Sequence, residues 1–311
     1  MKIVFLDRMT MGDADLSPIA TLGDLVCYES STAEEALERV GDCDVLLVNK
    51  VIVDAGLLDA APALKLVCVT ATGVNNIDLD AAAARGVEVR NAVGYSTSSV
   101  AQATFGHILS LLGNAPYYDE FVKNGEYSRG NCFTHLGAPI AELEGRTFGI
   151  IGMGNIGSRV ASIATAFGCR VIYYSTSGTS HCTLYPSVSL EELLSQSDIV
   201  SIHSPLNERT RNLIGKAELA LMKPGAILVN AGRGGIVDEA ALSQAVDSGQ
   251  IAGAALDVFS REPLPQDSPL LQTGHPERFR FAPHTAWASS EARARLVAMV
   301  AENIRTTLIN T

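Results

Sequence analysis

Three segments of the sequence place a reactive side chain shortly after an apolar run. Arg233 lies between glycines in Asn-Ala-Gly-Arg-Gly-Gly, Glu262 follows Leu-Asp-Val-Phe, and His284 stands in Ala-Pro-His-Thr-Ala-Trp. The guanidinium fork of an arginine suits the two oxygens of a carboxylate. A histidine with a neighbouring acid can carry a proton in general acid–base catalysis. Each residue alone is also compatible with an ordinary loop, so the joint pattern is what favours a site.

A glycine-rich segment follows another apolar run, at Phe148-Gly-Ile-Ile-Gly-Met-Gly-Asn-Ile-Gly157. Gly152 allows a tight turn, Gly154 allows a pyrophosphate to approach the backbone, and Gly157 allows a helix to pack closely on the strand. The helix that opens here presents free N–H groups and a partial positive charge to a diphosphate. The segment therefore predicts a dinucleotide site, with a turn selected only for packing as the alternative.

The end of the next predicted strand departs from the usual NAD pattern, which places an acidic residue there to bind the adenosine ribose. The strand ends at Tyr174, and Ser175 follows. Ser175 and the two residues after it carry hydroxyls that can donate hydrogen bonds to a 2′-phosphate. No Lys or Arg occurs between Arg170 and Arg209, so the usual phosphate partner is also missing. The choice between NAD and NADP is open.

Short apolar runs alternate with helical patterns along the whole chain, which indicates the α/β class with parallel sheets. Capping-box patterns at Thr32–Glu35 and Ser189–Glu192 mark two helix starts. Continuous apolar strands are typical of a parallel sheet that is covered on both faces. The predicted strands are Ile3–Leu6, Val45–Val48, Leu66–Val69, Val87–Arg90, Phe148–Ile151, Val171–Tyr174, Ile199–His203, Ala226–Asn230 and Ala254–Val258.

The length of 311 residues favours two domains. A long apolar helix at Val100–Leu112 separates a first sheet from a second sheet that begins near Phe148. The amphipathic segment Ala288–Leu308 has no strand after it. It can close the second domain or return to the first.

Composition excludes several classes of partner. The chain holds 23 Lys and Arg against 34 Asp and Glu, a net charge of −11, without a basic cluster, which argues against nucleic acid or an anionic membrane. No apolar run reaches the length of a membrane-spanning helix, and no signal-peptide core is found. The six cysteines are dispersed, and no histidine pair has metal-ligand spacing. We therefore expect a reduced, cytoplasmic protein without a metal.

The motifs described above, together with Ala71-Thr-Gly-Val-Asn-Asn-Ile-Asp78, resemble those of the D-isomer-specific 2-hydroxyacid dehydrogenases over essentially the whole chain. The resemblance implies an oxidoreductase that transfers hydride reversibly between NAD(H) or NADP(H) and a small 2-oxo or 2-hydroxy acid. It implies that Arg233 holds the substrate carboxylate, His284 is the acid–base residue, and Glu262 pairs with His284.

The same resemblance assigns further contacts. The backbone amides of Thr72, Gly73 and Val74 are expected to bind the substrate carboxylate, and Trp287 to wall the substrate pocket, with a packing role as its alternative. Besides Gly152, Gly154, Gly157 and Ser175, the expected cofactor contacts are Thr104, Asn155, Ile156, Ser204, Pro205, Thr210, Ala231 and Asp257.

The resemblance also implies two Rossmann-like or flavodoxin-like domains with parallel sheets. A cofactor domain at 98–284 is inserted into a substrate domain made of 1–97 and 285–311. A homodimer is expected through the cofactor domain. Its loop 114–145, which carries several aromatic residues, either forms an apolar arm that reaches the partner or packs on its own domain.

The substrate is the least determined feature. Val48-Asn49-Lys50, the region of Phe133, and Ala286-Trp287-Ala288-Ser289 look most like glycerate dehydrogenases, which reduce hydroxypyruvate or glyoxylate. A D-lactate-type or other 2-oxo acid reductase, an enzyme that takes hydride from formate or phosphite, and a non-catalytic NAD-sensing protein are the alternatives.

Overall fold

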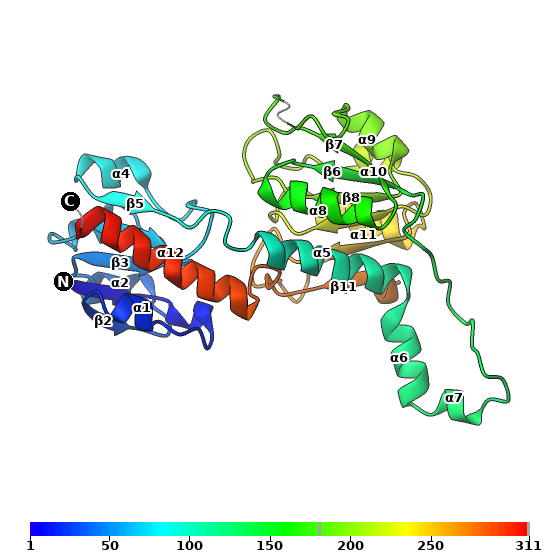
Figure 1. Cartoon of the computed structure of the whole chain (residues 1–311), viewed down its shortest axis with the longest axis horizontal. Helices are drawn as coiled ribbons and strands as arrows, with labels where there is room; N and C mark the ends of the chain where they lie inside the picture. The colour runs from blue at the N-terminus through cyan, green and yellow to red at the C-terminus, as the bar shows by residue number, and fades with distance from the viewer. Residues whose placement is uncertain (180–181, 310–311) are drawn as a thin grey trace. The chain divides into compact units, whose positions relative to one another are not determined.

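The computed structural model describes residues 1–179 and 182–309. The chain divides into two compact units, the first made of Met1–Ser96 and Ala288–Thr311 and the second of Thr97–Trp287 (Figure 1). Each unit is built on its own parallel sheet. The expected α/β class, with one parallel-sheet domain inserted into another, is confirmed.

The first unit has a five-stranded sheet in the order β2-β1-β3-β4-β5, and every neighbouring pair is parallel. This is the strand order of flavodoxin-like folds. The central strands are fully buried, as continuous apolar runs require when helices cover both faces. The strands are β1 (Lys2–Phe5), β2 (Asp24–Cys27), β3 (Val45–Val48), β4 (Leu66–Val69) and β5 (Glu88–Arg90).

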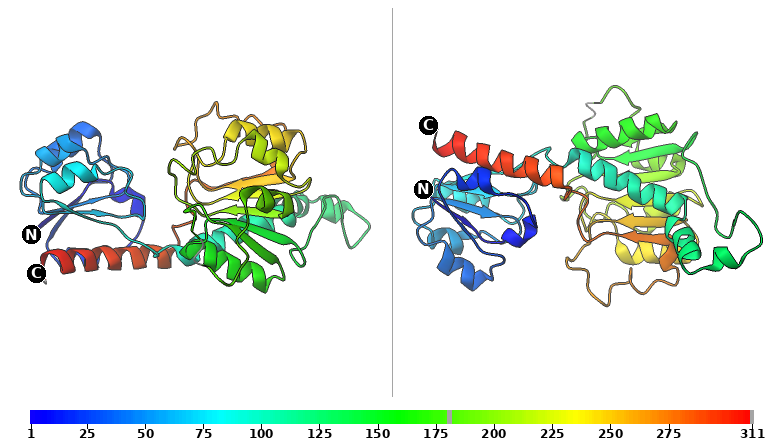
Figure 2. Two further views of the ribbon diagram at one scale, coloured as in Figure 1. Left: turned by 90° about the horizontal axis from the view of Figure 1, so that it is seen from above. Right: turned by 60° about the horizontal axis from the view of Figure 1, so that its bottom comes forward.

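Helices cover both faces of this sheet (Figure 2). The helix α12 (Ser290–Leu308) packs on β4 and on α1, so the C-terminal segment returns to the first unit. The predicted capping box at Thr32 and Glu35 is present and begins α2. The remaining helices of the unit are η1 (Arg8–Met11), α1 (Ser17–Ala20), α2 (Ala33–Arg39), α3 (Ala55–Asp59) and α4 (Leu79–Ala84).

The second unit has a six-stranded parallel sheet in the order β11-β10-β9-β8-β6-β7. From β6 the chain continues to β7 on one side and then crosses to β8 on the other, so the strand order reverses between β6 and β8. Ligands of open α/β sheets bind at such a switch point, outside the carboxyl ends of the strands. The strands are β6 (Thr147–Ile151), β7 (Arg170–Tyr174), β8 (Ile199–Ile202), β9 (Ile227–Asn230), β10 (Gly253–Leu256) and β11 (Phe279–Phe281).

Two apolar cores lie on the two faces of this sheet. One face is covered by α5 (Thr97–Leu112) and α8 (Asn155–Ala166), which contact each other. The other face is covered by helices that include α9, whose predicted capping box at Ser189 and Glu192 is present. The helices of that face are α9 (Leu190–Gln196), α10 (Lys216–Leu221) and α11 (Glu239–Asp247); η2 (Pro276–Arg278) precedes β11.

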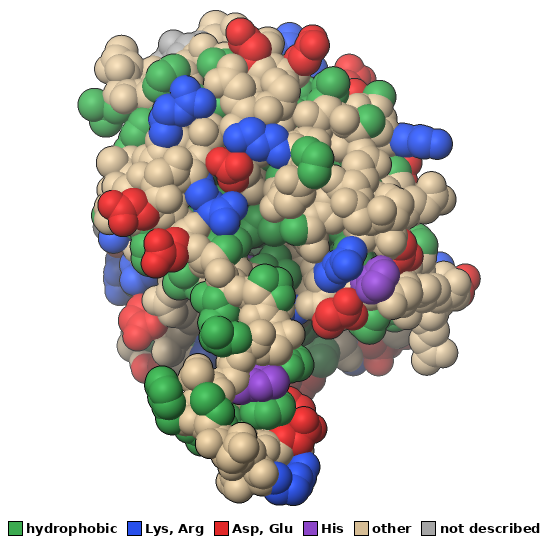
Figure 3. Space-filling view, turned by 90° about the vertical axis from the view of Figure 1, so that its right-hand side faces the viewer, with side chains coloured by type: hydrophobic (Ala, Val, Ile, Leu, Met, Phe, Trp, Pro, Cys, Tyr) green, Lys and Arg blue, Asp and Glu red, His purple; other side chains and the backbone are tan. Residues whose placement is uncertain are grey.

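Within the segment 114–145, α6 (Ala115–Lys123) and α7 (Glu126–Arg129) belong to an arm that projects from the second unit (Figure 1), whereas Leu143 near the end of the segment is buried in the core of that unit. Phe133 is 89% exposed and Leu136 is 79% exposed. The space-filling view shows apolar side chains gathered over this projection (Figure 3). These apolar side chains of the arm are therefore largely exposed.

The sequence analysis did not predict two of the strands. β2 and β11 are short edge strands, and each is partly exposed. An edge strand has one neighbour and less burial, so its sequence needs no continuous apolar run.

The chain leaves the second unit after Trp287, three residues later than expected. Ala286 and Trp287 pack with Val100 and Ala231 of that unit, and the Ser99 hydroxyl donates to the Ala286 carbonyl at 2.6 Å. Within the described ranges, no helix is both long and apolar enough to cross a bilayer.

Candidate active site

The three predicted reactive residues follow neighbouring strands of the second unit. Arg233 follows β9, Glu262 follows β10 and His284 follows β11. The three strands end level, because Leu256 at the end of β10 is in register with Asn230 and with Phe281. The three loops therefore leave the same edge of the sheet.

His284 and Glu262 form a hydrogen-bonded pair, with 2.7 Å between Nδ1 and Oε2. The other carboxylate oxygen of Glu262 accepts a hydrogen bond from the Phe259 amide at 3.0 Å, which fixes the carboxylate. Because the carboxylate accepts a hydrogen from Nδ1, Nε2 is the ring nitrogen left for proton exchange with a substrate. The side chains of His284 and Glu262 are 23% and 31% exposed, so solvent and small molecules can reach the pair.

The backbone of His284 is left-handed, with φ at +56°. For a residue other than glycine this conformation costs about 1–2 kcal/mol. The His284 amide donates to the carbonyls of Asp257 and Ala282, at 2.8 and 3.0 Å, and these bonds hold the conformation. Backbone strain of this kind is concentrated at functional sites.

The carboxylate of Asp257, directly after β10, anchors the loop that carries His284. It accepts hydrogen bonds from the amides of Thr285 and Ala286, both at 2.9 Å. Asp257 is only 2% exposed, and burial raises the pKa of its carboxyl group to about 6. Its observed contacts make it a positioning residue for His284, while its expected contact with the cofactor stays a prediction.

Arg233 is presented by a turn that Asn230 closes. The Asn230 side chain donates to the Arg233 carbonyl at 2.9 Å and accepts from the Gly232 amide at 3.1 Å. A Cβ at Gly234 would lie 1.8 Å from the Phe259 carbonyl oxygen, so a glycine is needed where this turn meets the loop of Glu262. Within the described part of the chain, the Arg233 guanidinium has no carboxylate partner and only bonds the Gly232 carbonyl. Its charge is therefore available to an anion.

The glycine turn lies at the switch point of the second sheet. Gly152 has φ at +93°, and a Cβ there would lie 2.9 Å from the Ser204 amide nitrogen. A Cβ at Gly157 would lie 2.1 Å from the Gly152 carbonyl oxygen, which explains the close packing of α8 on the turn. Gly154 faces open space, and no side chain caps the helix that starts at Asn155. The turn thus leaves room and free N–H groups for a pyrophosphate.

The other expected cofactor residues differ in how accessible they are. The Ser204 hydroxyl is buried and has no hydrogen-bond partner in the part of the chain that is described, so an acceptor or donor from a ligand suits it. Thr104 and Thr210 are fully buried, and their hydroxyls donate to the carbonyls of Val100 and Pro205. Their side chains support the local backbone, and contact with a cofactor stays a prediction for both.

Ile156, Ala231 and Trp287 belong to one small apolar cluster beside the glycine turn. Trp287 is partly buried there. This contact is compatible with both roles considered for the tryptophan, and neither is tested. The buried Ser204 hydroxyl, the open Gly154 and this apolar wall together fit an adenine dinucleotide with its nicotinamide.

In the first unit, the segment after β4 presents consecutive backbone amides. Those of Thr72, Gly73 and Val74 have no acceptor among the described residues. The Thr72 hydroxyl donates to the Ala92 carbonyl at 2.8 Å and the Asn91 side chain donates to the Thr72 carbonyl at 2.6 Å. The segment is therefore held in position by residues that follow β5. Successive free amides of this kind suit an anion such as a carboxylate.

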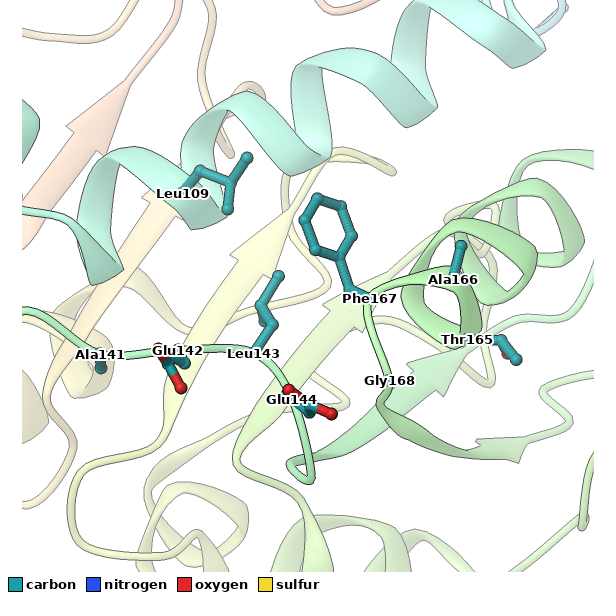
Figure 4. A pocket seen from close by; sticks show the side chains of 9 residues that line it. All are labelled: Leu109, Ala141, Glu142, Leu143, Glu144, Thr165, Ala166, Phe167 and Gly168. Carbon is teal, nitrogen blue, oxygen red and sulfur yellow. The ribbon is translucent and has the colours of Figure 1, made fainter.

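A cavity of about 600 Å³ lies near the opposite, amino-terminal edge of the second sheet (Figure 4). It is lined by the C-terminal end of α8, by Leu109 of α5 and by the segment 141–144. Its lining includes two glutamates but no histidine or arginine. It therefore lacks the pairing of cation and acid–base residue found at the carboxyl edge.

Comparison with known proteins agrees with this geometry. Residues 105–286 match the family described as D-isomer specific 2-hydroxyacid dehydrogenase, NAD binding domain. The chain is 37% identical to a glycerate dehydrogenase of Methylorubrum extorquens, over 97% of this chain and 95% of that protein.

The chain belongs to the D-isomer-specific 2-hydroxyacid dehydrogenase family.

Two further similarities support the assignment. A glyoxylate reductase of Aeropyrum pernix is 43% identical to this dehydrogenase over 89% of the chain and 83% of its own length. A solved protein of Thermus thermophilus has a TM-score of 0.90 and 32% identity, with 100% of this chain and 97% of that chain covered. The predicted family, fold and activity class are confirmed: the protein is a nicotinamide-dependent oxidoreductase that acts on 2-hydroxy acids.

The second unit contains the matched NAD-binding domain. In the described ranges no group of His, Cys, Asp and Glu side chains could hold a metal ion. The individual assignments of catalytic, substrate and cofactor residues stay predictions, because the comparisons concern the family and not these side chains.

Sequence reasoning missed the role of two polar residues of this dehydrogenase. Asn230 was part of a recognised motif without a function, although an asparagine at a strand end often closes a turn on its own backbone. Asp257 was expected only as a cofactor contact. Its bonds to Thr285 and Ala286 depend on the neighbouring β11, which the sequence did not predict.

The buried carboxyl group of Asp257 predicts a specific pH dependence of stability. Its pKa rises from an ordinary 3.8 to about 6 on folding, so the folded protein binds this proton more tightly than the unfolded chain does. The stabilisation is complete below about pH 4 and is lost as the pH rises through about 6. We expect Asp257→Asn, which keeps an acceptor at Oδ1, to abolish this loss of stability with rising pH. In the wild type the loss amounts to up to about 3 kcal/mol in the free energy of unfolding.

Urea unfolding at pH 4 and pH 7.5 gives the free energy of unfolding of wild type and of Asp257→Asn. The effect is the change between the two pH values in wild type minus the same change in the variant. Asp267→Asn, which alters an exposed carboxylate, is the matched control. Equal pH dependence in wild type and Asp257→Asn would contradict the prediction.

Proposed function

We propose that this dehydrogenase reduces hydroxypyruvate or glyoxylate to the corresponding 2-hydroxy acid, and that Arg233, Glu262 and His284 carry the reaction. The observation on which the proposal chiefly rests is the His284–Glu262 pair on strand ends adjacent to that of Arg233, an arginine to which the described residues offer no carboxylate partner. The substrate class is supported by the similarity to a glycerate dehydrogenase and a glyoxylate reductase.

Each side chain has a defined task in the proposed reaction. Arg233 binds the substrate carboxylate and orients the 2-oxo group, and the amides of Thr72, Gly73 and Val74 are proposed to donate to the substrate carboxylate as well. His284, protonated at both ring nitrogens, donates the Nε2 proton to the oxygen on which negative charge develops. Glu262 holds the ring through Nδ1 and stabilises its charged form. The nicotinamide supplies the hydride.

The dinucleotide is proposed to lie along the carboxyl edge of the second sheet. Gly152, Gly154 and Gly157 form the turn for its pyrophosphate, and Asn155 and Ile156 open the helix behind it. Ser175 lies at the ribose position after β7. The remaining proposed contacts are Thr104, Ser204, Pro205, Thr210, Ala231 and Asp257, with Trp287 at the substrate pocket.

Initial rates with hydroxypyruvate, glyoxylate, pyruvate and 2-oxoisocaproate, each with NADH and with NADPH, test the proposal. We expect kcat/KM to be largest for hydroxypyruvate or glyoxylate. A larger value for pyruvate would favour the D-lactate-type alternative, and a larger value for 2-oxoisocaproate would favour a reductase of branched 2-oxo acids.

We further propose that the protein is a homodimer formed through the second unit and that it acts in the cytoplasm. The exposed apolar residues Phe133 and Leu136 of the arm support a partner surface, and all six cysteines are free, as in a reducing compartment. Light scattering should give a mass of two chains, and Phe133→Asp with Leu136→Asp should shift it toward one. A single-chain mass for the wild type at micromolar concentration would contradict the dimer.

A further inference from the structure

The turn after β7 offers hydroxyls where a carboxylate is usual in NAD sites. The Ser175 and Ser177 hydroxyls are 3.1 Å apart, and both donate to the carbonyl of Thr179, at 2.6 and 3.0 Å. The two hydroxyls therefore converge within one turn. The stretch 175–179 contains no acid that could repel a phosphate.

Arg209 reaches this turn from the loop after β8, although it is distant in sequence. Its Nη1 donates to the Ser177 carbonyl at 3.0 Å and lies 3.5 Å from the position that a Cβ at Gly178 would take. Hydrogen bonds within the loop hold the backbone next to Arg209: buried Thr210 accepts from the Asn207 amide at 2.8 Å and donates to the Pro205 carbonyl at 2.7 Å.

The charge of Arg209 is not neutralised locally. Among the described residues no carboxylate forms an ion pair with it, and its one side-chain bond uses a single nitrogen of the guanidinium. The remaining N–H groups can bond phosphate oxygens, and a guanidinium binds a phosphate more strongly than neutral donors do. A ribose with a free 2′-hydroxyl gains nothing comparable, since the carboxylate that would accept its hydrogen is absent.

We propose that Arg209 binds the 2′-phosphate of NADPH, that the Ser175 and Ser177 hydroxyls turn from the Thr179 carbonyl to donate to the same phosphate, and that this dehydrogenase therefore prefers NADPH to NADH. The inference deepens the proposed function and rests on it for the direction of the reaction. The sequence around Ser175 contains no cation, and Arg209 provides one because the fold brings its loop to the same edge of the sheet.

Equilibrium binding of NADPH and NADH to the full-length protein, measured by calorimetry without substrate, tests the inference. We expect NADPH to bind at least about tenfold more tightly, and Arg209→Gln to weaken NADPH binding by about 10- to 100-fold while NADH changes less than about twofold. Arg211→Gln is the matched control, because this exposed arginine of the same loop makes no bond to 175–179. Ser175→Asp should weaken NADPH binding and strengthen NADH binding.

Two results would overturn the inference: wild-type protein that binds NADH as tightly as NADPH, or an Arg209→Gln protein that loses affinity for both by the same factor. The proposed function is tested separately by turnover. Tight, Arg209-dependent binding of NADPH without reduction of any 2-oxo acid would support this site and contradict the proposed reaction.

Discussion

Replacing His284 by alanine is expected to lower kcat for 2-oxo acid reduction by about 10²- to 10⁴-fold, the usual contribution of a positioned acid. The variant loses the imidazole that the structure pairs with Glu262 at the carboxyl edge. Cofactor affinity and stability should change little, because the side chain is partly exposed and the loop is held mainly by Asp257. Stopped-flow measurement of NAD(P)H oxidation at saturating substrate gives kcat directly.

The chain offers a matched control for this variant. His275 also pairs with an acid, with 3.1 Å between its Nδ1 and Oε1 of Glu277, but it lies on the surface before η2. His275→Ala should retain wild-type turnover. If His284→Ala turned over within about threefold of wild type on every 2-oxo acid, the assigned role would be wrong.

Arg233→Ala is expected to have the second large effect, a fall in kcat/KM for the 2-oxo acid. Removing one partner of a buried charge pair costs about 2–5 kcal/mol, which corresponds to about 30- to 5,000-fold. Most of the loss should appear as a higher KM for the 2-oxo acid, since the carboxylate is bound before the reaction. Arg233→Lys should be intermediate, because it keeps the charge and loses the bidentate fork.

Arg261→Ala is the control for Arg233, because Arg261 is exposed in the neighbouring turn. Its kcat/KM should match that of the wild type. An equal fall in both arginine variants would indicate a general effect of positive charge on substrate approach, and it would contradict a direct contact by Arg233.

Most of the strands that the sequence predicted are those whose packing demands apolar residues on both faces, and the largely exposed edge strand β5 is an exception. β3, β4, β8 and β9 are buried along their whole length, so their sequences are continuous apolar runs. The edge strand β11 contains an arginine whose side chain bonds Ser110 of α5, and such a strand has no distinctive pattern of its own. The predicted strand ends were nonetheless accurate enough to place Arg233 after β9 and Glu262 after β10.

By itself, the sequence determined the α/β class, the family and the glycine turn, and it predicted three reactive residues. These depend on residue types at short spacings, where backbone geometry leaves few alternatives. Only the tertiary structure decided which distant groups meet them: Asp257 under the histidine loop, Phe259 against Gly234, and Arg209 at the turn of Ser175. Such contacts join loops from different strands, so they arise from strand order and register, which spacing along the chain does not encode.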